Sequence, residues 1–155
     1  VASRGLGDVY KRQVRDREAL PLLLTLSSGV TGYTTIHAGS ARQALTRLRF
    51  VAQLADTARD LPLAALNTLV SESIDLVVHS ERGPTGPRVT EILAVEDLAG
   101  GPDAVQFTTT ELFRRATPDG PLEWTGLMPI RLGGRMARHG IEPRSVLTPG
   151  SGPTP

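Results

Sequence analysis

The sequence predicts an α/β fold in which helices come first and an antiparallel sheet follows. Three stretches, beginning near residues 18, 40 and 58, carry apolar residues at helical spacing. The apolar runs after residue 74 have the length and β-branched content of strands. The order is helix, strand, two helices and then a run of strands. A doubly wound fold has more strands in its first half, so this order suggests the second half of an α/β domain with an antiparallel extension.

Composition excludes several classes of protein. The chain has 155 residues, enough for one domain, and no cysteine, so it forms neither disulfides nor thiolate metal sites. No apolar run approaches the roughly 18 residues of a membrane span, which together with the missing cysteines favours a cytoplasmic protein. The formal net charge of +1 is too small to indicate nucleic-acid binding by charge alone.

A break in composition divides the chain. Lys11 is its single lysine, and every basic residue after residue 13 is Arg or His. We therefore expect residues 1–13 to be a non-native leader, although an ordinary flexible terminus gives the same pattern. Residues 14–144 form the main unit, and the Pro/Gly-rich residues 145–155 are expected to be a disordered tail.

The helical stretches have recognisable starts. Residues 18–26 form a short helix if Pro21 falls in its first turn, and residues 33–38 read as a short buried strand. Ser40 and Gln43 then form the S-x-x-Q capping box of a new helix. Its apolar face consists of Ala41, Ala44, Leu45, Leu48, Val51, Ala52 and Ala55.

The second half of the chain is expected to be mainly strands. A last long helix begins near Pro62 and turns Leu63, Leu66, Leu69 and Val70 inward. The next strands cover residues 74–81, 88–97 and 104–113, and the first two form a hairpin with a long turn. We expect Ile74, Leu76, Val77 and Val78 to be buried. Residues 121–142 hold a small strand and a short basic helix.

Three groups of side chains are candidates for chemistry. Arg15, Asp16 and Glu18 begin a helix, where they position a phosphate or simply complement the helix dipole. His37 ends the predicted strand beside the hydroxyls of Thr34, Thr35 and Ser40, where it either donates to a phosphate oxygen or is satisfied by a backbone carbonyl. Arg42 offers a guanidinium fork suited to phosphate, whereas Arg47 and Arg49 are expected on a solvated helix face.

Motifs of several enzyme classes are missing from the sequence. A P-loop requires G-x-x-x-x-G-K-[ST], and the single lysine, Lys11, is preceded by "DVY". The sequence also lacks H-E-x-x-H, G-x-S-x-G and a paired-histidine metal motif. On its residues alone the chain is not a complete enzyme, and we expect no metal ligands.

A series of segments in a fixed order resembles a known family. The segments are "VRDREA", "SSGVTGYTTIHAGSARQALTRL", "LPLAALNTLVSESIDLVVHSER", "RVTEILAVE", "TTTELF" and "EWTGLMPIRLGGRMARHGI". They resemble the type II/type IV secretion and pilus motor ATPases, in particular the CpaF-like branch of tight-adherence pili. The resemblance covers residues 14–144 and implies the C-terminal part of a RecA-like P-loop NTPase domain with an antiparallel β extension.

The resemblance implies roles for four residues. The histidine box falls on "TTIHAGSAR", with His37 near the γ-phosphate as a catalytic group and Arg42 as a phosphate contact. The stretch after Walker B falls on "VRDREA", which makes Arg15 a phosphate contact and Glu18 a catalytic group. Gln13 stands where the family has the Walker B glutamate, and Gly39 stands where its H-A-N-S motif has asparagine.

The resemblance also implies a function. The intact parent is expected to be a homo-hexameric ATPase that uses ATP and Mg²⁺ to power pilus assembly or secretion. It would lie at the inner face of the plasma membrane against inner-membrane platform proteins. This chain lacks the P-loop and is expected to be inactive alone. The alternatives are a non-catalytic interaction module of a secretion motor, or a nucleic-acid binder that uses Arg131, Arg135, Arg138, His139 and Arg144.

Overall fold

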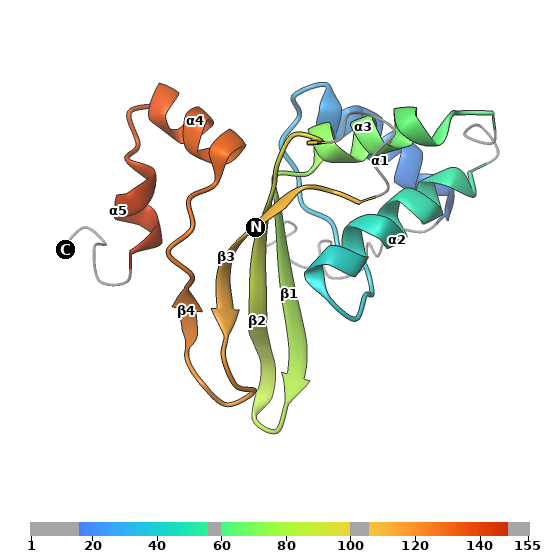
Figure 1. Cartoon of the computed structure of the whole chain (residues 1–155). Coiled ribbons are helices and arrows are strands. Elements are labelled where there is room, and N and C mark those ends of the chain that lie inside the picture. The colour runs from blue at the N-terminus through green and yellow to red at the C-terminus, as the bar shows by residue number, and fades with distance from the viewer. Residues whose placement is uncertain (1–15, 56–59, 100–105, 149–155) are drawn as a thin grey trace, which may run out of the picture.

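The computed structural model describes residues 16–55, 60–99 and 106–148, with three helices ahead of a sheet and two helices after it (Figure 1). The expected leader therefore lies outside the described residues. The elements are α1 (Asp16–Ser27), α2 (Ala41–Gln53), α3 (Leu63–Ser73), β1 (Leu76–Gly83), β2 (Gly86–Val95), β3 (Thr109–Arg115), β4 (Leu122–Trp124), α4 (Ile130–Arg138) and α5 (Pro143–Leu147).

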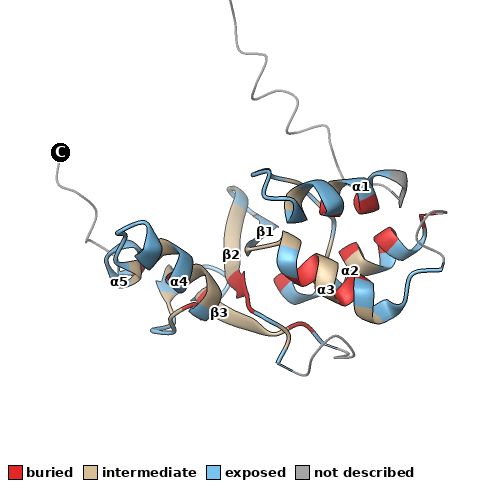
Figure 2. Ribbon diagram, turned by 90° about the horizontal axis from the view of Figure 1, so that it is seen from above, coloured by how far each residue is buried: buried red, intermediate tan, exposed pale blue. Residues whose placement is uncertain are grey.

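Helices α1 to α3 enclose the larger apolar core. Their fully buried residues include Leu23, Leu45, Leu66 and Val70, and Val95 at the end of β2 joins them. Figure 2 shows buried residues on the faces that α1, α2 and α3 turn toward one another. The apolar face predicted for α2 is confirmed, because each of its seven residues is less than 9% exposed.

The sheet has the order β1-β2-β3-β4, and all of its strand pairs are antiparallel. The β1–β2 hairpin is tighter than predicted, since Gly83 pairs with Gly86 and only Pro84 and Thr85 lie between them. Gly86 has φ of +125°, which a side chain would strain. A bulge follows His79, so that Thr90 and Glu91 of β2 both lie opposite this residue.

Helices α4 and α5 lie on the side of the sheet away from α1 to α3 (Figure 1). A second, smaller core joins them to the sheet through Ala94, Leu112 and Leu147, with Phe113 and Trp124 packed against it. Helix α4 ends at Arg138, Gly140 just past it has φ of +72°, and Ile141 N donates to Met136 O across this turn. The small strand and the basic helix expected in residues 121–142 are thus confirmed.

Several sequence predictions are wrong. Residues 33–38 form no strand, because Thr35 alone is in a bridge and Tyr33 is 93% exposed. Pro21 lies inside α1 rather than in its first turn. The predicted tail begins too early, since α5 runs through residues 145–147, whereas residues 149–155 lie outside the described part.

The sequence predicts that Leu63, Leu76 and Val78 are buried, and for these three residues the prediction is wrong. Leu63 is 46% exposed, because Pro62 is the N-cap of α3 and the first turn extends past the core. Leu76 and Val78 are 45% and 56% exposed. They alternate with Val77, which packs on the larger core, so β1 is an edge strand with one buried face rather than two. That the elements form part of a RecA-like domain stays a prediction.

The contrast between Leu66 and Leu63 gives a first test. Leu66→Ala should lower the free energy of unfolding by about 3 kcal/mol, because it leaves a cavity among α1, α2 and α3. Leu63→Ala, the matched control, should lower it by less than about 1 kcal/mol. Urea denaturation of both variants checks this, and equal losses would contradict the described packing.

Candidate functional site

The candidate site is the junction of residues 37–42, where an extended segment enters α2. Ser40 caps the helix: its Oγ accepts a hydrogen bond from Gln43 N at 3.2 Å. Gln43 Oε1 in return accepts from Gly39 N at 3.2 Å. The predicted capping box is confirmed in its forward bond, while its return bond goes one residue further back than the motif requires.

Gly39 is matched to this return bond. A Cβ at position 39 would lie 2.8 Å from Gln43 Oε1, which is closer than van der Waals contact allows. An asparagine here would therefore displace the Gln43 side chain. The glycine that stands in place of the asparagine of H-A-N-S thus leaves the space in which the Gln43 side chain bonds to the backbone.

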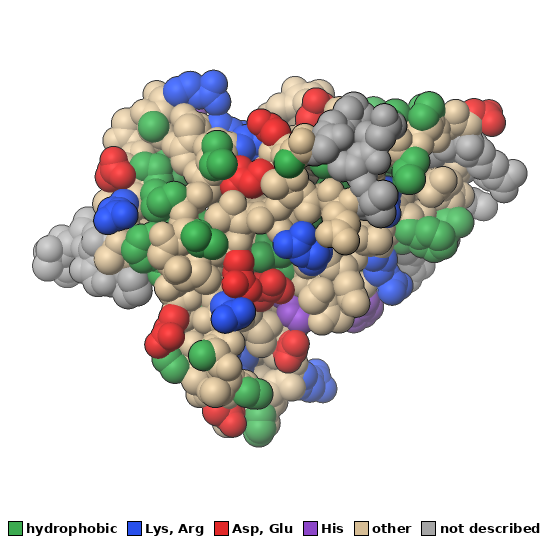
Figure 3. Space-filling model, viewed as in Figure 1, with side chains coloured by type: hydrophobic (Ala, Val, Ile, Leu, Met, Phe, Trp, Pro, Cys, Tyr) green, Lys and Arg blue, Asp and Glu red, His purple; other side chains and the backbone are tan. Residues whose placement is uncertain are grey.

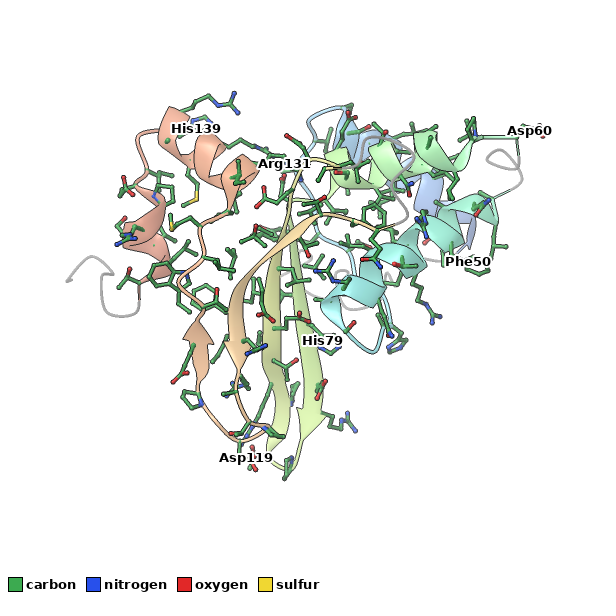
Figure 4. All side chains as sticks on the ribbon, viewed as in Figure 1. Phe50, Asp60, His79, Asp119, Arg131 and His139 are labelled. Carbon is green, nitrogen blue, oxygen red and sulfur yellow. The ribbon has the colours of Figure 1, made fainter. Side chains whose placement is uncertain are left out.

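Side chains of the β1–β2 hairpin form hydrogen bonds with the backbone of the junction. Glu91 Oε2 accepts from Ala41 N, the first amide of α2, at 3.1 Å. His79 Nε2 lies 3.2 Å from Ala38 O, and since a carbonyl only accepts, Nε2 carries the proton. His79 Nδ1 lies 2.9 Å from Thr90 Oγ1. The His79 side chain is 12% exposed, and Figure 4 shows it between β1 and the start of α2.

Two of the four predicted site residues, His37 and Arg42, lie at the two ends of this junction in sequence, and no contact joins them among the described residues. His37 is exposed and has no hydrogen-bond partner among the described residues. Arg42 lies one turn further on and donates from Nη1 to Phe107 O at 3.1 Å. Glu18 is exposed in the first half of α1 and bonds to neither of them, and Arg15 lies outside the described residues. The catalytic and phosphate-binding roles of all four stay predictions.

Two shallow cavities adjoin the junction. One has a volume of about 540 Å³ and runs from Ala38 and Gly39 along α2 to Phe50. The other, of about 360 Å³, lies beside Arg42, Gln106 and Phe107. Arg49, expected to be solvated, instead donates from Nη1 to Asn67 Oδ1 at 2.8 Å and lies 5.6 Å from the Phe107 ring centroid. Arg47 is exposed, as predicted.

A buried carboxylate on the other side of the sheet was not predicted from the sequence. Glu96 directly follows β2 and is 5% exposed. Its Oε1 accepts from Thr110 Oγ1 at 2.8 Å and from Ile130 N at 3.0 Å, and its Oε2 accepts from Arg131 N at 2.8 Å. Glu96 therefore caps the N-terminus of α4 with charge as well as hydrogen bonds. The sequence feature that could have indicated this role is the acidic residue directly after the apolar run "ILAV".

The side chain of Arg131 ties α4 to α3 and β1, as Figure 4 shows. It donates to Ser71 O and, through Nη2, to Ile74 O at 2.6 Å. Nη2 also lies 3.4 Å from Asp75 Oδ1, and Nη1 lies 3.8 Å from Asp97 Oδ1. The arginine is thus compensated by two carboxylates, which a partly buried charge requires.

Contacts within the chain engage three of the five basic residues named for the nucleic-acid alternative. Arg131 is only 15% exposed at its side chain, and Arg135 pairs with Asp75 at 2.6 Å. Arg144 lies 5.9 Å from the Trp124 ring centroid. Arg138 and His139 remain exposed without a partner among residues 16–55, 60–99 and 106–148. Of the five basic residues only Arg131 is largely withdrawn from the surface, so nucleic-acid binding by the other four stays a prediction.

The described residues offer neither a metal site nor a membrane span. No group of three His, Cys, Asp or Glu side chains there is arranged to hold a metal ion. None of the helices in that part of the chain has the length and hydropathy to span a bilayer.

Comparison with known proteins places the chain near conjugation proteins. It is 40% identical over 90 residues to the probable conjugal transfer protein TrbB of Sinorhizobium fredii (strain NBRC 101917 / NGR234). It is 36% identical over 85 residues to the conjugal transfer protein TrbB of Rhizobium radiobacter. These matches cover 57% and 54% of this chain but 26% and 24% of the relatives, so the chain spans about a quarter of their length. No protein-family model matches it.

The relatives correct the resemblance drawn from the sequence. Segments such as "VRDREA" and "TTIHAGSAR" predict a CpaF-like ATPase of tight-adherence pili. Both matched proteins instead carry the name of a conjugal transfer protein. The assignment to the CpaF-like branch is therefore wrong. Sequence motifs alone did not separate the two kinds of protein.

The cap on α4 gives a second test. Glu96→Ala removes three accepted hydrogen bonds and leaves two helix amides without a partner, so it should cost about 3 kcal/mol of unfolding free energy. Glu123→Ala, at an exposed position of β4, should cost less than about 0.5 kcal/mol. Urea denaturation followed by circular dichroism measures both, and a near-neutral Glu96→Ala would show that α4 does not depend on this carboxylate.

Proposed function

We propose that the chain is part of an ATP-driven motor subunit of a conjugal transfer apparatus, a type IV secretion system. Its similarity to the two conjugal transfer proteins supports the conjugation part of the proposal. In this proposal the helices and the sheet are part of a RecA-like domain. Because the match spans only about a quarter of either relative, the activity, cofactors and partners of a whole protein all belong to the proposal.

The exposure of the His37 ring is the observation that supports the nucleotide part of the proposal. Its ring is exposed and bonds to none of the described residues, while the backbone after it is held by His79 and Glu91. This side chain is available to a ligand because its ring nitrogens have no partner in the described part of the chain, and the backbone after it is already ordered. The proposed ligand is the terminal phosphate of ATP, with Arg42 as a second donor.

The described residues fit only an outer contact to ATP and Mg²⁺. The first amide of α2 already donates to Glu91, so the helix start does not offer it to a phosphate. The described part of the chain provides no cluster of carboxylates for a metal ion. His37 and Arg42 would therefore complement a nucleotide held mainly by other residues, and Glu18 would act only if that nucleotide reached α1.

The proposal also covers the oligomeric state of the motor and its location in the cell. The motor would be a homo-hexamer, peripheral to the inner face of the plasma membrane, and would contact inner-membrane platform proteins. A second candidate is a module that binds motor subunits without hydrolysis. The missing P-loop favours this candidate for the chain taken by itself.

An ATPase assay separates the proposals. The 155-residue chain should show no ATP hydrolysis above a boiled control, because it has no P-loop. In a longer natural protein that contains this chain, His37→Ala should lower ATP turnover by about 100-fold while leaving the circular dichroism spectrum unchanged. His139→Ala is the matched control and should retain full turnover. Wild-type turnover by the His37→Ala protein would reject the role of His37, and a longer protein without turnover would favour the non-catalytic module.

A further inference from the structure

The outer face of α4 is exposed and partly apolar. Ile130 is 82% exposed, and Gly134, Ala137 and Arg138 are exposed at helical spacing from it. Ile141, just past the helix, is 45% exposed. The opposite face of α4 is turned inward, where Glu96 and Arg131 fix it. Figure 3 shows hydrophobic side chains interspersed with basic and acidic ones over the region of α4 and α5.

Gly134 has no function that the described residues explain. Glycine destabilises the interior of a helix relative to alanine. A Cβ at Gly134 would meet nothing within 4 Å among the described residues, and its φ is not positive. The neighbouring Gly133, in contrast, is buried with Pro143 Cγ 3.7 Å from the position of a Cβ. The missing side chain at position 134 therefore leaves bare backbone at the centre of the exposed face.

The charged residues of α4 itself are all basic, and the exposed Glu142 follows the helix. Arg131 pairs with Asp75 and Asp97, and Arg135 pairs with Asp75. Arg138 has no partner in the described part of the chain, and His139 follows it at the C-terminal end of the helix. A ligand on the outer face would meet apolar surface at Ile130 and a positive charge at Arg138.

We infer that the outer face of α4 is a docking site for an amphipathic helix of a partner protein that carries acidic side chains. Ile130 packs against the apolar stripe of that helix, and an acidic side chain pairs with Arg138. The bare backbone at Gly134 lets the two helices approach closely, as small residues do at helix crossings. This inference is independent of the proposed ATP chemistry.

Two other occupants fit the face less well. A bilayer surface needs no close approach to backbone and gains more from large side chains than from a glycine. A second copy of the chain would bring α4 against α4, and the exposed acid that follows this helix, Glu142, already accepts from Arg144 N. Charge complementarity therefore favours the acidic partner helix.

Binding of designed peptides tests the inference. Two helical peptides share one apolar face of Leu and Ala, and the flanking positions carry Glu in one and Lys in the other. Fluorescence anisotropy with the 155-residue chain should show at least about tenfold tighter binding of the Glu peptide. Ile130→Glu and Gly134→Leu should each weaken that binding by at least about tenfold. Phe50→Glu, at an exposed apolar position of α2, should leave it unchanged.

Gly134→Ala distinguishes docking from a structural role. It should raise the Tm of the free chain by about 3 °C, because alanine is the better helix former and the space is open. It should nevertheless weaken binding of the Glu peptide. A lower Tm would show that the glycine serves the fold of the chain itself and would overturn the inference.

Three further results would overturn it. The first is equal affinity for the Glu and Lys peptides, or no binding of either. The second is binding to phosphatidylglycerol vesicles that Gly134→Leu abolishes, which would identify a membrane surface. The third is a dimer in sedimentation equilibrium that the same substitution dissociates, which would identify a second copy of the chain.

Discussion

Two helices of this protein begin with backbone amides that donate hydrogen bonds to carboxylates. One carboxylate belongs to a residue of strand β2 and the other to the residue directly after this strand. A helix start leaves backbone amides without partners, and leaving them unpaired inside a protein is costly. Glu91 of β2 accepts from the first amide of α2, and Glu96, five residues later, accepts from the first two amides of α4. An odd separation along a strand directs side chains to opposite faces. β2 therefore orients a helix on each side of the sheet.

This arrangement connects the two surfaces with proposed roles. On one side, Glu91 and His79 fix the backbone of residues 38–41 and leave the His37 ring free. On the other, Glu96 and Arg131 hold the inward face of α4 and leave Ile130 and Gly134 exposed. The same residues that stabilise each helix thus determine which of its groups remain available for a ligand.

Local features could be predicted from the sequence, whereas features that depend on distant residues could not. The Ser40 cap and the apolar face of α2 follow from neighbouring residues, and both were found. The bond between Ala41 and Glu91 spans 50 positions, and no sequence pattern marks such a pair. The exposure of Val78 could not be predicted, because an apolar run does not distinguish an edge strand from a central one. His79, which holds the backbone at the candidate site, carried no motif at all.

Amide hydrogen exchange at Ala41 tests the central claim most directly. Ala41 N donates to the Glu91 side chain and to no backbone carbonyl among the described residues. In Glu91→Ala its protection should fall by at least about tenfold, while Leu45 inside α2 keeps its protection. Arg82→Ala, at an exposed position of the same hairpin, should change neither amide. Unchanged protection at Ala41 in Glu91→Ala would show that β2 does not orient the start of α2.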